Sequence, residues 1–82
     1  MSRRLALSEV ALGGAGRVAD IALEPEEVGW LRAVGLFEGA RITLLRRAPF
    51  GGPLHLRTGS GAEFADDRDL ARAVMLDLEA AG

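Results

Sequence analysis

The spacing of glycine and proline limits the fold of this chain more than any other feature. Between residues 13 and 61, the longest stretch without either residue is nine residues long, at 40–48. Glycine and proline end regular elements and form turns. This region can therefore hold only short strands and short helices, a pattern typical of a small β protein.

Alternating apolar side chains within these pieces predict strands. We expect them at residues 16–21, 41–48, 54–57 and 62–65. Val18 and Ile21 cannot both face inward on a regular strand, so a bulge or a sharp bend is expected between them. Residues 49–53 contain two prolines and two glycines, which predicts a turn. Residues 59–61 predict a second, tight reversal.

Residues 25–34 form the clearest helix in the sequence. Pro25 suits the first helical position, where its missing N–H is not needed, and Glu26 and Glu27 place negative charge at the positive end of the helix dipole. Gly35 follows where a left-handed cap is favoured. Four apolar side chains fall within an arc of roughly 160°, which predicts a broad buried face: Val28, Trp30, Leu31 and Val34.

Periodicity leaves the C-terminal segment open between helix and strand. Residues 67–80 are rich in helix formers, and Leu70, Val74 and Leu78 recur at helical spacing. Val74, Leu76 and Leu78 also alternate with polar or flexible side chains, which is the pattern of a strand. Periodicity by itself favours the helix slightly.

The composition indicates a single folded domain over residues 1–82. Hydrophobic residues make up 49% of the chain, well above the range of disordered sequences. The formal charge of −2, with the two signs interspersed, argues against a nucleic-acid partner, which would require a basic stripe. No apolar run approaches the ~18 residues of a membrane span, so we expect no direct membrane insertion and a cytoplasmic protein. Cysteine is absent, which excludes disulfides and thiolate metal sites.

Few residues are suited to catalysis, so we predict that the protein is not an enzyme. His55 is the only histidine, and no hydroxyl has the setting of an activated nucleophile. Hairpin geometry could bring Glu63 across from His55, and such ligands suit a weakly bound divalent metal, Fe²⁺ or Zn²⁺. One histidine without cysteine is too few for a closed structural site, so no cofactor is required.

Four stretches, in this order and spacing, resemble the FeoA family (ferrous iron transport protein A). Residues 7–18 resemble its opening, a Leu-containing turn that leads to a Gly-x-Val strand. Residues 31–39 resemble its helix end, Leu-x-x-x-Gly-Leu followed two residues later by Gly. Residues 47–54 resemble the Ala-Pro-x-Gly-Asp-Pro turn, with Gly52 in place of the usual Asp, and residues 68–76 resemble the closing Arg-x-x-Ala before a last strand.

The resemblance implies a mainly β, small α+β fold. This is a closed, SH3-like, five-stranded barrel with one inserted helix at about residues 25–34. The resemblance also decides the C-terminal segment in favour of a short helical turn at about residues 67–72 and a strand at residues 73–78. The residues that shape this scaffold are Leu31, Gly35, Gly39, Pro49, Pro53 and Ala71.

The resemblance further implies an accessory protein of bacterial ferrous iron uptake. Such a protein acts by protein–protein interaction with the cytoplasmic domain of the FeoB transporter. Aromatic and arginine side chains are enriched at interface centres, which predicts one partner-binding patch: Trp30, Leu36, Phe37, Arg46, Arg47 and Phe50. Alternatively, Trp30 plugs the bottom of the barrel.

The runner-up interpretation is an SH3-like regulatory or metal-sensing domain related to the C-terminal module of iron-dependent repressors. That module usually follows a DNA-binding part, which this sequence lacks. Whether the chain forms a homo-oligomer stays open at this point.

Overall fold

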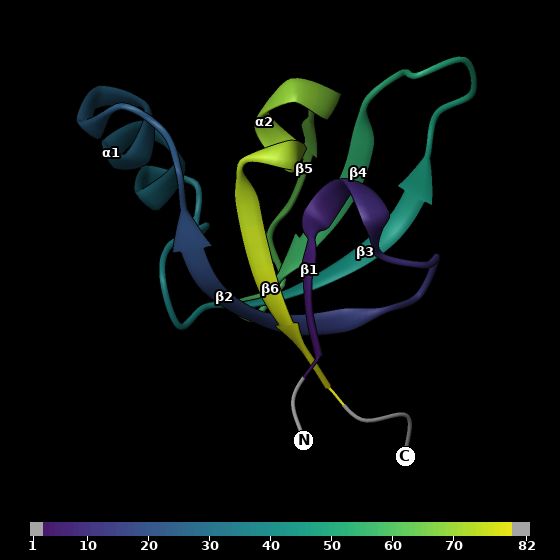
Figure 1. The fold of residues 1–82 in the computed structure, drawn as a ribbon, viewed down its shortest axis with the longest axis horizontal. Coiled ribbons are helices and arrows are strands. Elements are labelled where there is room, and N and C mark those ends of the chain that lie inside the picture. The colour runs from purple at the N-terminus through teal and green to yellow at the C-terminus, as the bar shows by residue number, and fades with distance from the viewer. Residues whose placement is uncertain (1–2, 80–82) are drawn as a thin grey trace.

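The computed structural model describes residues 3–79, which form one strongly curved antiparallel sheet with two α-helices and one 3-10 helix (Figure 1). Helix α1 lies at one side of the sheet, the β3–β4 hairpin lies at the other, and α2 lies between them. In chain order, the elements are β1 (Arg3–Ala6), η1 (Leu7–Glu9), β2 (Ala15–Ile21), α1 (Pro25–Ala33), β3 (Arg41–Arg47), β4 (Leu54–Thr58), β5 (Glu63–Asp66), α2 (Arg68–Arg72) and β6 (Val74–Leu78).

The strand order is β1-β6-β2-β3-β4-β5. Strand β6 therefore lies between β1 and β2 and pairs with both. The SH3-like fold class is confirmed, but the sheet has six strands where the sequence predicted five. The additional strand is β1. Its charged Arg3-Arg4 pair gives no apolar alternation, so the strand could not be predicted, and in the described part of the chain it pairs with β6 alone. Within residues 3–79, β1 and β5 are the sheet edges, so the expected closure of the barrel does not come from backbone pairing.

Two irregularities bend the central strands. The register of β2 against β6 shifts between Val18 and Asp20, and the register of β3 against β4 shifts between Leu44 and Arg46. The first lies where the sequence predicted a bulge or bend. Because a bulge adds one residue to one strand and increases its twist, these positions allow a single sheet to curl around its own core.

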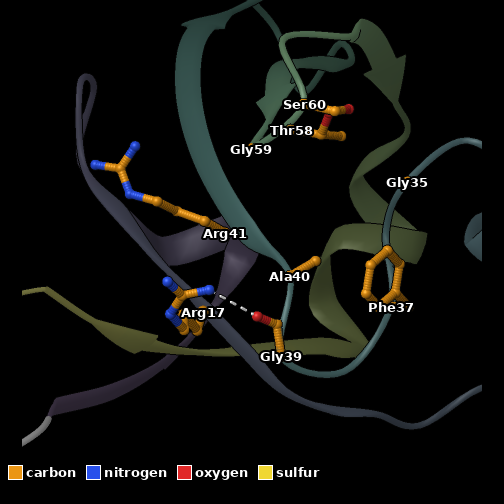
Figure 2. Close-up of a pocket in the computed structure, with 9 residues that line it drawn as sticks. All are labelled: Arg17, Gly35, Phe37, Gly39, Ala40, Arg41, Thr58, Gly59 and Ser60. Atoms are coloured by element: carbon orange, nitrogen blue, oxygen red, sulfur yellow. Dashed lines mark hydrogen bonds between the residues drawn. The ribbon is translucent and has the colours of Figure 1, made fainter.

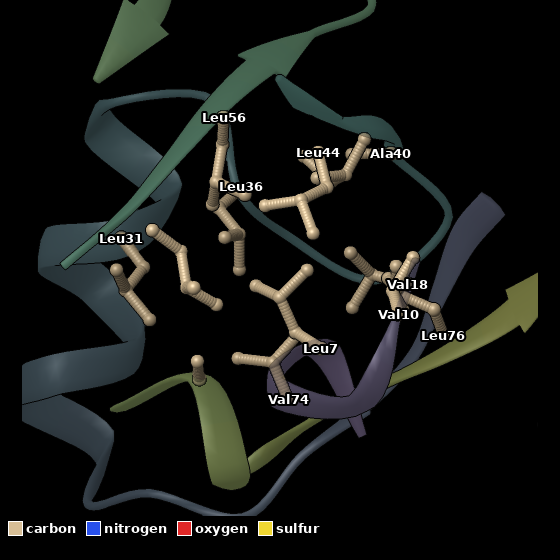
Figure 3. Close-up of a cluster of buried hydrophobic side chains, with 13 residues drawn as sticks. Leu7, Val10, Val18, Leu31, Leu36, Ala40, Leu44, Leu56, Val74 and Leu76 are labelled. Carbon is tan, nitrogen blue, oxygen red and sulfur yellow. The ribbon is translucent and has the colours of Figure 1, made fainter. Parts of the chain in front are cut away.

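The core is an aliphatic cluster inside the curved sheet (Figure 3). Each strand except β1 and β5 contributes fully buried side chains, and η1, α1 and α2 add Leu7, Leu31 and Ala71 from outside the sheet. Leu54 and Leu56 share the inner face of β4, as their alternation predicts, whereas Arg57 is exposed. The remaining members of the cluster are Val10, Val18, Leu36, Ala40, Ile42, Leu44, Val74 and Leu76.

Helix α1 does not have the broad buried face that its sequence predicted. Leu31 is its only fully buried residue, Val28 and Val34 are half-buried, and Trp30 is 69% exposed. The helix projects from the side of the barrel (Figure 1), so most of its surface faces solvent. Trp30 therefore does not plug the barrel. Within residues 3–79, neither helix is long and apolar enough to cross a bilayer.

Candidate functional site

The turn that ends helix α1 lines a pocket of the described residues at Gly35. The Leu36 N–H donates to the Leu31 carbonyl oxygen at 2.9 Å, and the Gly35 N–H donates to that of Arg32 at 3.1 Å. These two bonds define a Schellman motif, with Gly35 in the left-handed region at φ 98°. Leu31 and Leu36 are both buried, which is the hydrophobic contact that accompanies this cap. The Leu-x-x-x-Gly-Leu stretch is thus a helix stop that turns the chain into the core.

We call the adjoining cavity the barrel-end pocket. It has a volume of about 440 Å³ and is lined from β2, the α1–β3 connection, β3 and the β4–β5 turn (Figure 2). Gly39 has φ 89°, so it can turn the chain into β3 at the pocket's rim. The lining residues are Arg17, Gly35, Phe37, Gly39, Ala40, Arg41, Thr58, Gly59 and Ser60.

Charge at this pocket comes from two neighbouring arginines. Arg17 on β2 and Arg41 on β3 are directly opposed in the sheet. Arg17 donates from Nη1 to the Gly39 carbonyl oxygen at 3.0 Å (Figure 2). Arg41 donates two hydrogen bonds to the Glu79 carboxylate, from Nε to Oε1 at 2.5 Å and from Nη2 to Oε2 at 2.9 Å. The register of β2 against β3 places these two arginines opposite each other, so no local sequence signal could have predicted the pair.

The predicted partner patch is divided in the structure. Leu36 is fully buried and cannot contact a partner. Trp30 lies on α1, at one side of the molecule, whereas Phe50 lies at the tip of the β3–β4 hairpin, at the opposite side (Figure 1). Phe37 is partly exposed at the barrel-end pocket and is stacked beneath Arg32, whose Cζ is 5.4 Å from the ring centre. The structure therefore offers separate aromatic sites instead of one patch.

Phe50 is the most unusual of these aromatics. Its ring is fully exposed, and its backbone φ of 57° lies in the left-handed region that residues other than glycine seldom adopt. Gly51 follows at φ 74°, and the Gly52 N–H closes the turn by donating to the Pro49 carbonyl oxygen at 3.1 Å. Pro49 and Pro53 flank this turn, as predicted.

Helix α2 supports the hairpin tip. Arg68 donates from Nε to the Gly52 carbonyl oxygen at 3.0 Å and from Nη2 to the Ala48 carbonyl oxygen at 3.4 Å. The same helix buries Ala71 in the core and is capped by the Asp67 side chain, which accepts from the Leu70 N–H at 2.8 Å. The Arg-x-x-Ala stretch thus anchors the hairpin that carries Phe50.

The two predicted arginines of the patch differ in role. Arg47 donates to the carbonyl oxygens of Ser8, at 3.0 Å, and Val10, so it fastens the segment after β1 to β3. Arg46 is exposed on the outer face of β3, opposite His55. Only Arg46 remains available at the surface.

His55 and Glu63 share the outer face of the β4–β5 hairpin but are not directly opposed. His55 pairs with Ala65, and Glu63 pairs with Arg57, to which it forms an ion pair at 3.3 Å. The observed register differs from the expected one by two residues, because the turn extends to Gly61, whose N–H donates to the Thr58 carbonyl oxygen. Within residues 3–79, no group of three or more potential ligands lies close enough to hold a metal ion.

Asp66 is a buried carboxyl group that sequence reasoning missed. It is 5% exposed, and its Oδ2 has no hydrogen-bond partner among residues 3–79. Loss of solvation, followed by the nearby charge of Asp67, raises the pKa of Asp66 to about 6. The available signal was alternation, because Asp66 follows Phe64 by two residues and so shares the inner face of β5.

Comparison with known proteins agrees with this geometry. The FeoA domain model matches residues 5–78. The crystal structure of an iron uptake regulatory protein (FeoA) is similar at 32% identity, with a TM-score of 0.85 over 94% of this chain and 100% of that chain. A zinc-complexed FeoA from Stenotrophomonas maltophilia, described as a prokaryotic SH3 domain protein, is 26% identical, with a TM-score of 0.70 over 94% of this chain and 89% of that chain.

A manganese-dependent transcriptional repressor shares the fold alone. It is 21% identical, with a TM-score of 0.84 over 96% of this chain but only 44% of the repressor. A search of curated proteins returns no match to this sequence. The helix stop at Gly35, the proline-flanked hairpin and the last strand between the first two all lie within residues 5–78. By that match and by its SH3-like structure, the chain belongs to the FeoA domain family, which is associated with ferrous iron uptake.

Proposed function

We propose that this protein is a cytoplasmic accessory of bacterial ferrous iron uptake that binds the cytoplasmic domain of the FeoB transporter and acts by that binding instead of by catalysis. Membership of the FeoA family supports the pathway. The fully exposed, strained Phe50 is the single observation that supports a binding role.

Phe50 has no stabilising role within residues 3–79. A left-handed φ costs a residue with a Cβ on the order of 1–2 kcal/mol, and the exposed ring buries nothing in return. The flanking prolines and Arg68 nevertheless hold the tip in place. A rigid, exposed aromatic side chain is the usual anchor of a protein interface, because it buries a large area with little loss of conformational entropy.

Titration of the FeoB cytoplasmic domain with this protein tests the proposal. We expect binding by the wild type and a loss of at least about tenfold in affinity for Phe50→Asn, since interface anchors contribute about 2 kcal/mol or more. Asparagine tolerates a positive φ, so the hairpin is expected to keep its shape. Trp30→Ala, at the other side of the molecule, serves as the matched control. Absence of binding without nucleotide, with GDP, with a GTP analogue and with Fe²⁺ would contradict the proposal.

The proposal requires no resident metal, and we infer only weak binding of Fe²⁺ or Zn²⁺ at His55. The zinc in the Stenotrophomonas maltophilia protein supports some affinity for divalent cations. Arg46 opposite His55, and the engagement of Glu63 with Arg57, both weaken such a site. Calorimetry that gave sub-micromolar binding, abolished by His55→Ala, would favour the alternative function of a metal-sensing domain related to the repressor module.

A further inference from the structure

One arginine on the outer face of the sheet, beside the barrel-end pocket, has no ion-pair partner among residues 3–79. Arg4, Asp77, Arg17 and Arg41 form one row across β1, β6, β2 and β3. Asp77 pairs with Arg4 at 3.1 Å, and Glu79 pairs with Arg41. The hydrogen bond to Asp77 and, to a lesser extent, the nearby charge of Asp20 raise the pKa of Arg4, so Arg4 and Arg41 both have carboxylate partners. Arg17 is the one arginine of this row that forms no ion pair within residues 3–79, where its one hydrogen bond goes to the neutral Gly39 carbonyl.

Arg17 and Arg41 would repel each other without an anion nearby. Like charges placed directly opposite on neighbouring strands are destabilising. Glu79 offsets the charge of Arg41, and because Arg17 lies close to it as well, both arginines contribute to lowering the pKa of Glu79, the Arg41 hydrogen bond most strongly. The chain thus already binds one carboxylate at this place.

Further hydrogen-bond donors line the same pocket. A guanidinium has five N–H donors, so Arg17 keeps four besides the bond to Gly39. The hydroxyls of Thr58 and Ser60 lie 2.9 Å apart. One of them donates to the other, and the acceptor keeps its own O–H for a ligand. Phe37 provides an apolar wall on the opposite side of the pocket (Figure 2).

We propose that the barrel-end pocket binds a carboxylate side chain from an acidic segment of a partner protein, with Arg17 and the Thr58–Ser60 hydroxyl pair as donors. This proposal rests on the function proposed above. A carboxylate fits better than a phosphate, because its single charge matches the one unmatched guanidinium. Phe37 favours an apolar residue next to the acidic one, as a peptide supplies. Glu79 competes with such a ligand for the positive charge of Arg17 and Arg41. Its ion pair with Arg41 is about half exposed and therefore weak, so a ligand can compete with it.

The direct test is nuclear magnetic resonance on the full chain. We would titrate a ten-residue peptide of alternating leucine, glycine and glutamate, its counterpart with every glutamate replaced by glutamine, and inorganic phosphate at equal ionic strength. We expect the glutamate peptide to shift the amide signals of Gly39, Gly59 and Ser60 and the Arg17 side-chain signal. Equal shifts with the glutamine peptide, shifts confined to other residues, or tighter binding of phosphate would each overturn the proposal.

Three variants assign the effect to named residues. Arg17→Gln keeps a donor for Gly39 but loses the charge, and we expect it to weaken binding of the glutamate peptide at least about fivefold. Arg46→Gln, an exposed arginine outside this pocket, is the matched control and should bind within about twofold of the wild type. Glu79→Gln frees Arg41 and should strengthen binding. Unchanged affinity in Arg17→Gln, or weaker binding in Glu79→Gln, would contradict the assignment.

The same variants separate this inference from the proposed function. If the FeoB cytoplasmic domain binds the wild type and Arg17→Gln equally well, the pocket is not its docking site, while the proposed function stands. If the domain does not bind the wild type at all, the proposed function fails, and the peptide titration still decides what the pocket binds.

Discussion

At the scale of single residues, Gly35 shows how one position decides a local structure. Its φ of 98° allows the chain to leave α1 and to turn Leu36 into the core. A Cβ at this position would also lie 3.1 Å from the Thr58 Cγ2 atom. Both the backbone angle and the space therefore favour glycine.

Alanine at Gly35 should destabilise the fold. We expect a loss of about 1–3 kcal/mol in the free energy of unfolding, because a Cβ in the left-handed region is strained. Urea unfolding followed by circular dichroism measures this. Gly29→Ala is the matched control, since Gly29 lies within α1 with no atom near its missing Cβ. It should stabilise by about 0.5–1 kcal/mol. Equal effects at the two glycines would contradict the role given to Gly35.

Asp66 makes stability depend on pH. Its pKa rises from an ordinary 3.8 to about 6 on folding, so the folded state binds the proton more tightly than the unfolded state. The stability that the protonated Asp66 contributes should therefore be fully present below about pH 4, fall as the pH rises towards about 6, and be absent above that. A tenfold change in proton affinity corresponds to about 1.4 kcal/mol, so the fall is on the order of 2 kcal/mol once screening by nearby solvent is allowed for.

Asp66→Asn should remove this fall and stabilise the protein at pH 7. Unfolding curves measured from about pH 4 to about pH 7.5 would show a flatter profile than the wild type. Asp69→Asn is a suitable control, because Asp69 is exposed on α2 beside Arg72. A wild-type stability that rises over this range, with the same rise in Asp66→Asn, would contradict the buried carboxyl as its cause.

At the scale of elements, α1 is held to the barrel mainly by its C-terminal end. Leu31 and Leu36 are buried on either side of the Gly35 turn, whereas Trp30 faces solvent. Amphipathic spacing predicts a helix correctly, but it cannot show how much of the helix the barrel covers. That depends on where α1 meets the sheet, and here the one fully buried side chain of the helix, Leu31, lies in its last turn.

This arrangement predicts opposite outcomes for two large side chains. Leu36→Ala should cost about 2–5 kcal/mol, as expected for a buried leucine, whereas Trp30→Ala should change stability by no more than about 0.5 kcal/mol, as expected at a surface. Thermal and urea unfolding of both variants check this. A large loss on removal of Trp30 would mean that the indole is packed against the barrel after all.

At the scale of the whole molecule, β6 holds the sheet together because it pairs with both β1 and β2. Gly16 on β2 makes the close approach possible. A Cβ there would lie 2.5 Å from the Asp77 carbonyl oxygen and 3.1 Å from the Leu78 Cα. Two backbones would have to separate to make room.

Gly16→Ala should therefore weaken the whole fold. We expect a loss of at least about 2 kcal/mol, a large share of the roughly 5 kcal/mol by which a small domain is stable. Hydrogen exchange should show faster exchange in β1, β2 and β6 together. Gly59→Ala is the control, since its Cβ would make only an ordinary contact with Arg41, at 3.6 Å. A similar loss at Gly59 would remove the special role of the β2–β6 approach.

Much of this organisation could be predicted because it is local. The helix at Pro25–Ala33, its stop at Gly35, the hairpin turn at residues 49–53 and the bulge after Val18 agree with the sequence-based expectations. Each depends on backbone preferences and side-chain alternation over a few neighbouring residues. The choice of a strand at Val74–Leu78 required family resemblance, because its periodicity suited a helix as well.

The candidate site was less predictable, because it is assembled from distant residues. The sequence by itself determined that short antiparallel strands and one capped helix would enclose a small aliphatic core. Only the tertiary structure decided that Arg3–Ala6 is a strand, that Trp30 and Phe50 lie far apart (Figure 1), and that Arg17 and Arg41 meet beside a pocket. The physical reason is that strand register and packing against the sheet place side chains far apart in sequence together, and no local preference encodes either one.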